Sequence, residues 1–122
     1  MFHRVSQERY VRVQRSADEE GIVVVDADGR MKTPDELSRG AAEQLYLCLR
    51  LGLAEEFARR AEPMPLVMDD VLVNFDAARR RTTAELLLDF SDRHQILLFT
   101  CHEEIANMIH GLRPDTRLIE LS

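Results

Sequence analysis

Two adjacent carboxylates follow a short apolar run near the middle of the chain. Residues 65–68 read Pro-Leu-Val-Met and lead directly into Asp69 and Asp70, while a second apolar run at 96–99 leads to His102. Carboxylate oxygens bind Mg²⁺ directly or through water, and a neighbouring carboxylate or histidine can orient a water or contact a phosphate oxygen. The residue types therefore suit the hydrolysis of a nucleotide or another phosphate ester.

The two apolar runs must be brought together for this chemistry. Each predicts a buried strand with polar residues at its C-terminal end, and residues 76–92 between them are long enough for one helix, with Asp76 as its N-cap. The simplest topology is a right-handed crossover with parallel strands, which puts Asp69, Asp70 and His102 at the sheet edge where α/β proteins bind ligands. Two alternatives stay open: strand ends become polar where they meet solvent, and His102 is a turn residue or helix cap.

A third candidate is the start of a long helix. Ser38 and Gly40 open an apolar segment, and the positive end of a helix dipole there favours an anion such as phosphate. An ordinary serine N-cap explains the same residues. A capping-box pattern predicts a short turn at 33–37, before the long helix begins. Pro63 and Pro65 are expected to end that helix. The helix is apolar on most sides, so it is expected to be buried on most sides.

The remaining segments predict the scaffold. Residues 9–14 alternate polar and apolar side chains and 22–25 are β-branched, which predicts an antiparallel hairpin or meander. A short helix is expected at 103–110 with Gly111 at its C-cap position, followed by a last strand at 117–121. The predicted fold is α/β, with a mainly parallel sheet flanked by helices and an N-terminal antiparallel hairpin.

Composition narrows the class of protein. The chain has 122 residues, 45% hydrophobic and 31% charged, which predicts one globular domain over 1–122. It has no apolar run long enough for a membrane span and no signal peptide, so a cytoplasmic location is expected. A net charge of -6 argues against a broad nucleic-acid surface, and residues 79–81, three arginines, are interpreted as a solvated helix face. Cys48 and Cys101 lack metal-ligand spacing and are interpreted as reduced, structural thiols in core segments rather than as a disulfide or a zinc site.

Taken in order, these motifs resemble the C-terminal half of an ABC-type ATPase head of the SMC-like, coiled-coil DNA-repair class, closest to its YhaN-like AAA branch. Leu-Ser-Arg-Gly-Ala at 37–41 resembles the ABC signature loop, and Leu-Val-Met-Asp-Asp at 66–70 resembles Walker B. Val-Asn-Phe-Asp at 73–76 is similar to the D-loop, and Thr-Cys-His at 100–102 to the segment of the switch histidine. The resemblance therefore implies part of a P-loop NTPase fold.

The resemblance also implies roles for individual residues. Asp69 would bind Mg²⁺, Asp70 would polarise the attacking water, and His102 would contact the γ-phosphate. The signature loop would bind ATP held by an opposing head through Ser38, Arg39 and Gly40. Asp76 would communicate across the interface between the two heads. The implied cofactors are therefore ATP and Mg²⁺, and a second head is an implied partner, as a homodimer.

The chain departs from the family pattern at several points, among them Val71 in place of the common proline after Walker B. Asp70 stands where most ABC heads have glutamate, Arg39 replaces the first glycine of the signature loop, and the P-loop pattern G-x-x-x-x-G-K-[ST] is absent. A P-loop-containing N-terminal lobe, on the same or a neighbouring polypeptide, is therefore an implied partner. The isolated chain is expected to be nearly inert towards ATP.

Three functions remain open at this point. The first is a head lobe that hydrolyses ATP in a composite dimeric site, in DNA repair or chromosome maintenance, with DNA bound only by the full assembly. The second is a non-catalytic remnant or regulatory dimerisation module of the same fold. The third is a metal-dependent phosphohydrolase that uses Asp69 and Asp70 without a partner.

Overall fold

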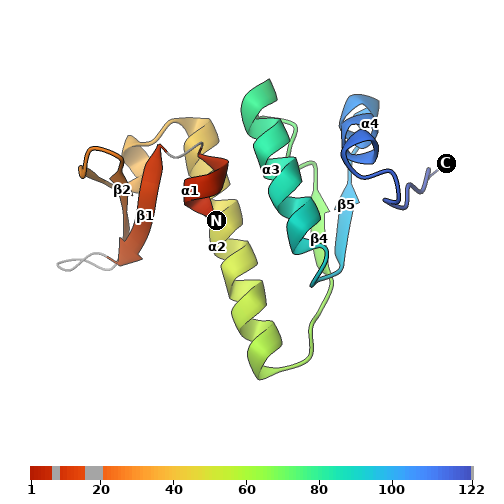
Figure 1. Cartoon of the computed structure of the whole chain (residues 1–122), viewed down its shortest axis with the longest axis horizontal. Helices are drawn as coiled ribbons and strands as arrows, with labels where there is room; N and C mark the ends of the chain where they lie inside the picture. Colours follow the sequence, from red (N-terminus) through yellow and green to blue (C-terminus); the bar gives the residue numbers. More distant parts are fainter. Residues whose placement is uncertain (7–8, 16–20, 122) are drawn as a thin grey trace. The chain divides into compact units, whose positions relative to one another are not determined.

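A computed structural model describes residues 1–6, 9–15 and 21–121. The chain divides into two compact units, Met1–Glu62 and Pro63–Ser122 (Figure 1). The first contains an antiparallel sheet and the second a parallel pair of strands, so the predicted α/β class is confirmed. Within the described ranges, no helix combines the length and apolar character needed to span a bilayer. The expectation that residues 1–122 act as one domain stays a prediction.

The first unit contains the predicted meander. Strands β1 (Tyr10–Arg15), β2 (Ile22–Asp26) and β3 (Met31–Lys32) form an antiparallel sheet in that order. The turn between β2 and β3 is held by Asp26, whose Oδ1 accepts hydrogen bonds from two backbone N–H groups, both at 2.9 Å. Gly29 in this turn has a φ of 84°, a conformation that glycine adopts without steric cost. The turn residues thus fold as their chemistry predicts.

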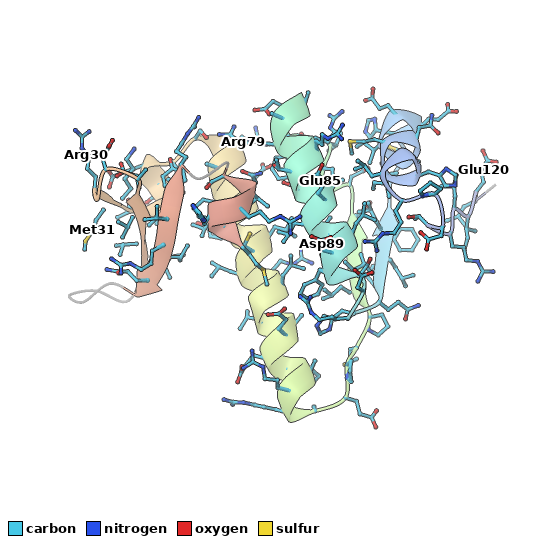
Figure 2. All side chains as sticks on the ribbon, in the orientation of Figure 1. Arg30, Met31, Arg79, Glu85, Asp89 and Glu120 are labelled. Atoms are coloured by element: carbon cyan, nitrogen blue, oxygen red, sulfur yellow. The ribbon has the colours of Figure 1, made fainter. Side chains whose placement is uncertain are left out.

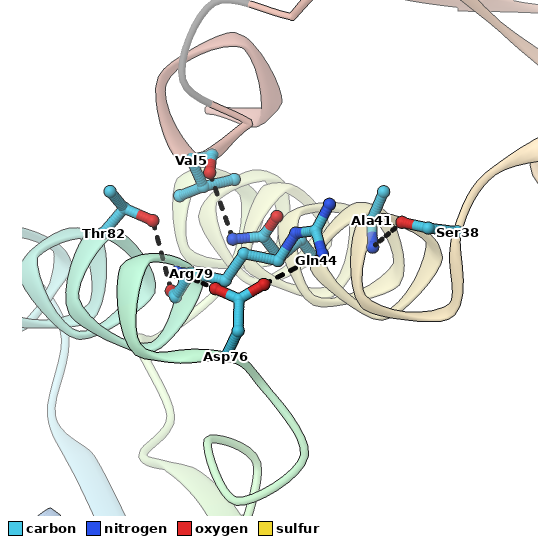
Figure 3. Close-up of polar contacts among 7 residues, drawn as sticks. All are labelled: Val5, Ser38, Ala41, Gln44, Asp76, Arg79 and Thr82. Atoms are coloured by element: carbon cyan, nitrogen blue, oxygen red, sulfur yellow. Dashed lines mark hydrogen bonds and ion pairs between the residues drawn. The ribbon is translucent and has the colours of Figure 1, made fainter.

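A short helix that the sequence pattern did not predict, α1 (Phe2–Val5), completes the core of this unit. The ring of Phe2 stacks on Tyr10 of β1, with 5.3 Å between the ring centroids. The carbonyl oxygen of Val5 accepts a hydrogen bond of 3.1 Å from Nε2 of Gln44 (Figure 3). At four residues, α1 is too short to show a helical period in the sequence.

The long helix α2 (Arg39–Arg60) follows a short 3₁₀ helix, η1 (Pro34–Glu36), as the sequence predicts. The prediction that α2 is buried on most sides is wrong for its second half, where Leu53 is 71% and Phe57 51% exposed. Within the first unit, α1 and the sheet lie beside the first half of α2 only (Figure 1). The buried residues of α2 are Ala41, Gln44, Leu45, Leu47, Cys48 and Leu51, so its burial ends just past the middle of the helix.

The second unit begins with the predicted strand, helix and strand. Strands β4 (Leu66–Asp69) and β5 (Ile96–Phe99) are parallel, and α3 (Ala77–Phe90) connects them. Every residue of β4 is paired with one of β5, ending with Asp69 opposite Phe99. The two strands therefore end at the same level of the sheet.

The C-terminal part differs from the prediction at two points. Gly111 lies inside α4 (Glu103–Leu112), and Arg113 is the C-cap residue instead. Residues 117–121 form no strand, because no strand of the described chain pairs with them. Apolar side chains of this tail are more than half exposed, and Glu120 projects from it (Figure 2). Residues 117–121 therefore have the sequence pattern of a strand but no neighbouring strand to pair with.

Arg113 ties the end of α4 to the end of α3. Its Nη1 donates hydrogen bonds to the carbonyl oxygen of Leu88 at 2.8 Å, to Oγ of Ser91 at 3.1 Å and to a carboxylate oxygen of Asp92 at 2.9 Å. We expect Arg113→Met to lower the free energy of unfolding by about 1–3 kcal/mol, because these acceptors lose a charged donor. Urea denaturation measures the change. The control Arg117→Met, at an exposed tail residue, should leave stability unchanged, and an equal loss there would contradict this role.

Candidate functional site

Strands β4 and β5 bring the predicted site residues of the second unit to one sheet edge. A carboxylate oxygen of Asp70, Sγ of Cys101 and a ring nitrogen of His102 all lie within 4.8 Å of one another. Asp69 is the last residue of β4 and is exposed. The predicted convergence of Asp69, Asp70 and His102 is therefore observed, while their roles remain predictions.

Asp70 has an unusual backbone conformation. Its φ is 49°, the one positive value at a non-glycine residue among those described. Aspartate enters this left-handed region more readily than most residues. The N–H of Asp70 still donates to the carbonyl oxygen of Phe99 at 2.8 Å, so β5 holds the residue while the chain turns away after it. Backbone strain of this kind is typical of functional sites.

The Asp70 carboxylate is held in its ionised form. The Thr100 hydroxyl makes the largest contribution to lowering the pKa of Asp70, and partial burial acts in the opposite direction. The Cys101 thiol, which donates to Oδ2 at 3.5 Å, and the charge of His102 lower that pKa further. Oδ1 is buried and has no hydrogen-bond partner in the described part of the chain. It is therefore an available acceptor for a water or a cation.

His102 is the N-cap residue of α4, but its side chain makes no capping hydrogen bond. The backbone forms the cap: the His102 carbonyl oxygen accepts from the N–H of Ile105 at 3.1 Å, and the His102 N–H donates to Oγ1 of Thr100 at 3.1 Å. Helix capping therefore fixes where the residue stands and leaves its imidazole available for another contact.

Cys101 was predicted to be a core thiol, and this prediction is wrong because its side chain is exposed. Phe99, two residues earlier on the strand, is exposed too, as expected for side chains on one face of a strand. Cys48 is buried as predicted, and burial raises its pKa to about 11. Both cysteines are free thiols. The sequence signal that was missed is that residues 99 and 101 are two positions apart, so on an extended chain their side chains point to the same face.

Asp76 begins α3 at the end of the loop that follows Asp70. Its Oδ1 accepts from the Arg79 N–H at 2.9 Å, and its Oδ2 accepts from Nη1 of Arg79 at 3.3 Å (Figure 3). This confirms the predicted N-cap. The loop between Asp70 and Asp76 is therefore fixed at both ends.

Arg80 holds the middle of this loop. Its Nε donates to the carbonyl oxygen of Leu72 at 3.3 Å and its Nη2 to that of Val73 at 3.2 Å. The interpretation of residues 79–81 as a solvated helix face is therefore correct only for Arg81, whose side chain is 66% exposed, against 22% for Arg79 and 23% for Arg80. Arginines near a helix N-terminus oppose the dipole, and this was the signal that they had another role.

The signature-loop residues lie in the first unit. Ser38 is the N-cap of α2, and its Oγ accepts from the Ala41 N–H at 3.2 Å (Figure 3). The Arg39 side chain is 84% exposed and forms an ion pair of 3.3 Å with Glu43, while Gly40 lies in the first turn. These three residues are therefore grouped at the start of a 22-residue helix, as predicted.

Comparison with solved structures identifies the class of this fold. The chain is similar to a structure from work on ATP-driven dimerization and DNA stimulated activation of SMC ATPases, with a TM-score of 0.64 and 14% identity over 88% of this chain and 73% of that one. At this identity the likeness concerns the fold alone: it is that of an SMC ATPase. No family model matches the chain.

Among curated proteins, the chain is similar to the uncharacterized protein YhaN of Bacillus subtilis strain 168. The two are 35% identical over 112 residues, which are 90% of this chain and 11% of YhaN. The chain therefore spans about a tenth of the relative that it matches. Together the two comparisons confirm the predicted resemblance to an SMC-like, YhaN-like ATPase.

The contacts of Arg80 predict a measurable change in loop mobility. We expect Arg80→Met to make the backbone amides of residues 71–75 exchange with solvent about three- to tenfold faster, because two carbonyl groups lose their charged donor. Hydrogen exchange followed by mass spectrometry measures this. Arg81→Met is the matched control, since Arg81 pairs with exposed Glu85 and should leave the loop unchanged. Equal exchange rates in the two variants would show that the hydrogen bonds of Arg80 do not hold the loop.

Proposed function

We propose that the chain is a head lobe of an SMC-like ATPase that supplies the metal and water side of a composite ATP site. The observation that carries this proposal is the meeting of Asp70 and His102 at the ends of two parallel strands, directly after Asp69. Asp70 polarises the attacking water, and His102 contacts the γ-phosphate. The lowered pKa of Asp70 supports its role, because an ionised carboxylate accepts a proton or a hydrogen bond from water.

The acidic residues at the strand ends fit Mg²⁺. Asp69 offers an exposed carboxylate at the end of β4, and Oδ1 of Asp70 is a buried oxygen without a hydrogen-bond partner among the described residues. Hard divalent cations take such oxygen ligands. When bound, Mg²⁺ neutralises negative charge on the phosphates. We assign Asp69 as its ligand.

An exposed apolar face supports the partnership with a P-loop-containing lobe. Parallel sheets are normally covered on both faces, but here Val67 is 57%, Leu97 42% and Phe99 45% exposed. These three side chains alternate with inward-facing neighbours along β4 and β5. A further lobe that carries the phosphate-binding loop would cover this face, on the same or a neighbouring polypeptide.

The start of α2 supports an interface with a second head. Ser38 and Gly40 stand at the positive end of a long helix dipole, which favours an anionic ligand. Arg39 is exposed, and its surface ion pair with Glu43 contributes little, so its guanidinium can turn to a phosphate at low cost. In this proposal these residues bind ATP held by the opposing head of a homodimer. Asp76 communicates across that interface.

The biological role follows from the same resemblance. Work on the similar solved SMC ATPase concerns ATP-driven dimerization and DNA stimulated activation. We therefore propose a role in DNA repair or chromosome maintenance, with DNA bound by the full assembly. A non-catalytic dimerisation module of the same fold is the second candidate, and Asp70 in place of glutamate and Arg39 in place of glycine favour it.

Substitution of Asp70 separates the two candidates. The chain is combined with its P-loop lobe, and ATP turnover is measured with Mg²⁺. We expect Asp70→Asn to lower kcat by about 10²-fold or more, because the amide cannot accept the proton of the attacking water. Asp115→Asn, in the exposed turn after α4, is the matched control and should turn over normally. Equal turnover of Asp70→Asn and the wild-type protein would remove Asp70 from the mechanism, and no turnover of either protein would favour the non-catalytic module.

The oligomeric state tests the role of the signature loop. With the P-loop lobe present, light scattering of the slow Asp70→Asn variant should give a dimer in ATP and Mg²⁺ and a monomer in ADP. Arg39→Glu should weaken the ATP-dependent dimer, because it puts a carboxylate where phosphate is expected to bind. Arg59→Glu, at the other end of α2, is the control. A monomer in ATP for the Asp70→Asn variant would contradict the dimer.

A further inference from the structure

Cys101 adds a sulfur ligand to the strand-end cluster, and the proposed ATPase chemistry does not use it. Its Sγ lies with a carboxylate oxygen of Asp70 and a ring nitrogen of His102, all within 4.8 Å of one another. The three residues come from the ends of two paired strands in one compact unit. One oxygen, one sulfur and one nitrogen atom therefore converge on a single point.

The spacing of these atoms suits a tetrahedral metal ion. With metal–ligand bonds of the usual lengths, a thiolate sulfur and a carboxylate oxygen of one Zn²⁺ lie about 3.5 Å apart, and the nitrogen lies about 3.3–3.6 Å from each. The observed distance from Cys101 Sγ to Asp70 Oδ2 is 3.5 Å. The remaining distances are at most 4.8 Å, so side-chain rotations have to shorten them when the ion binds. Three protein ligands with an open fourth position also match known zinc sites.

The charges and the access route favour a thiophilic ion over Mg²⁺ at this point. A carboxylate and a thiolate together neutralise a divalent cation, and a neutral imidazole completes the set. Sulfur and nitrogen ligands select Zn²⁺, whereas Mg²⁺ takes oxygen ligands and keeps several waters. Cys101 is exposed, so an ion can reach the cluster from solvent. Binding converts the Cys101 thiol to a thiolate and releases its proton to the buffer.

We propose that Asp70, Cys101 and His102 form a binding site for a thiophilic divalent cation, Zn²⁺ or an ion of similar chemistry. Such an ion coordinates Asp70 and His102, so neither side chain can act on a nucleotide while the ion is bound. Zn²⁺ would then inhibit ATP hydrolysis reversibly, and this consequence, unlike the binding itself, rests on the proposed function.

Cobalt is the probe for the binding test, because Co²⁺ replaces Zn²⁺ at such sites and is coloured. The purified full chain is titrated with Co²⁺ in metal-free buffer without nucleotide. We expect thiolate-to-cobalt absorption in the near ultraviolet and tetrahedral cobalt bands in the visible, both removed by Zn²⁺. Cys101→Ser should abolish the thiolate band and weaken Co²⁺ binding by about tenfold or more, and His102→Gln should also weaken it.

The control variants remove ligands of the same kinds elsewhere in the chain. Cys48→Ala removes the buried thiol of α2, and His110→Gln removes an exposed imidazole of α4. Both variants should show the same cobalt spectrum and the same Co²⁺ affinity as the wild-type chain. Circular dichroism confirms that every variant is folded. The proposal would be overturned if the wild-type chain gave no thiolate-to-cobalt band, or if folded Cys101→Ser still gave one.

A second measurement tests the inhibitory consequence. ATP turnover of the chain with its P-loop lobe is measured with and without Zn²⁺ at constant Mg²⁺. We expect Zn²⁺ to inhibit the wild-type protein, and we expect inhibition of Cys101→Ser to need about tenfold more Zn²⁺. If the assembly shows no turnover at all, the proposed function fails while the cobalt result stands. If turnover is normal but Zn²⁺ inhibits both proteins equally, inhibition through this cluster is excluded.

Discussion

The parallel register of β4 and β5 is the constraint on which the candidate site depends. Hydrogen bonds fix it at both ends: the N–H of Leu66 donates to the carbonyl oxygen of Gln95 at 2.9 Å, and that of Asp70 donates to Phe99 at 2.8 Å. Successive side chains on a strand point to opposite faces, so a slip of one residue would exchange the faces of β4. Asp70 would then lie away from His102. The pairing of short apolar strands thus sets the position of every polar group at this edge.

The loop after β4 extends this constraint to the start of α3. Asp70 turns the chain through a left-handed conformation, Arg80 binds two carbonyl groups of the loop, and Asp76 caps the helix that follows. Each interaction is modest, and an arginine that binds two carbonyl groups adds geometric constraint as well as energy. Because the three act in sequence along seven residues, the loop has few ways to move independently of the sheet. The residues that resemble Walker B and the D-loop are therefore joined by a loop that is held at both ends and in its middle.

The sequence predicted the elements more accurately than the surroundings of single residues. Asp76, Ser38 and the two apolar runs have local signals, since caps and continuous apolar runs depend on nearby residues. The signals of Cys101 and Arg80 are weaker, because they do not name the surroundings of either residue. An apolar run without alternation does not reveal which residues face outward, so the face that Cys101 shares with Phe99 could not be recognised as the exposed one. The partners of Arg80 are backbone carbonyl groups, which no sequence pattern specifies.

The exposed tail and the exposed half of α2 were mispredicted for the same reason: an apolar pattern indicates that a surface can be buried, and the covering partner decides whether it is. This point also bears on the chemistry. Phosphoryl transfer requires positioned phosphates and a site that excludes water. Asp69 and Phe99 are exposed at the strand ends and Cys101 is exposed just beyond them, so this edge is open to solvent. An enzyme that used Asp69 and Asp70 alone would have to work in bulk water, where its charges are weakly felt. The geometry therefore favours a site completed by a second surface over an independent phosphohydrolase.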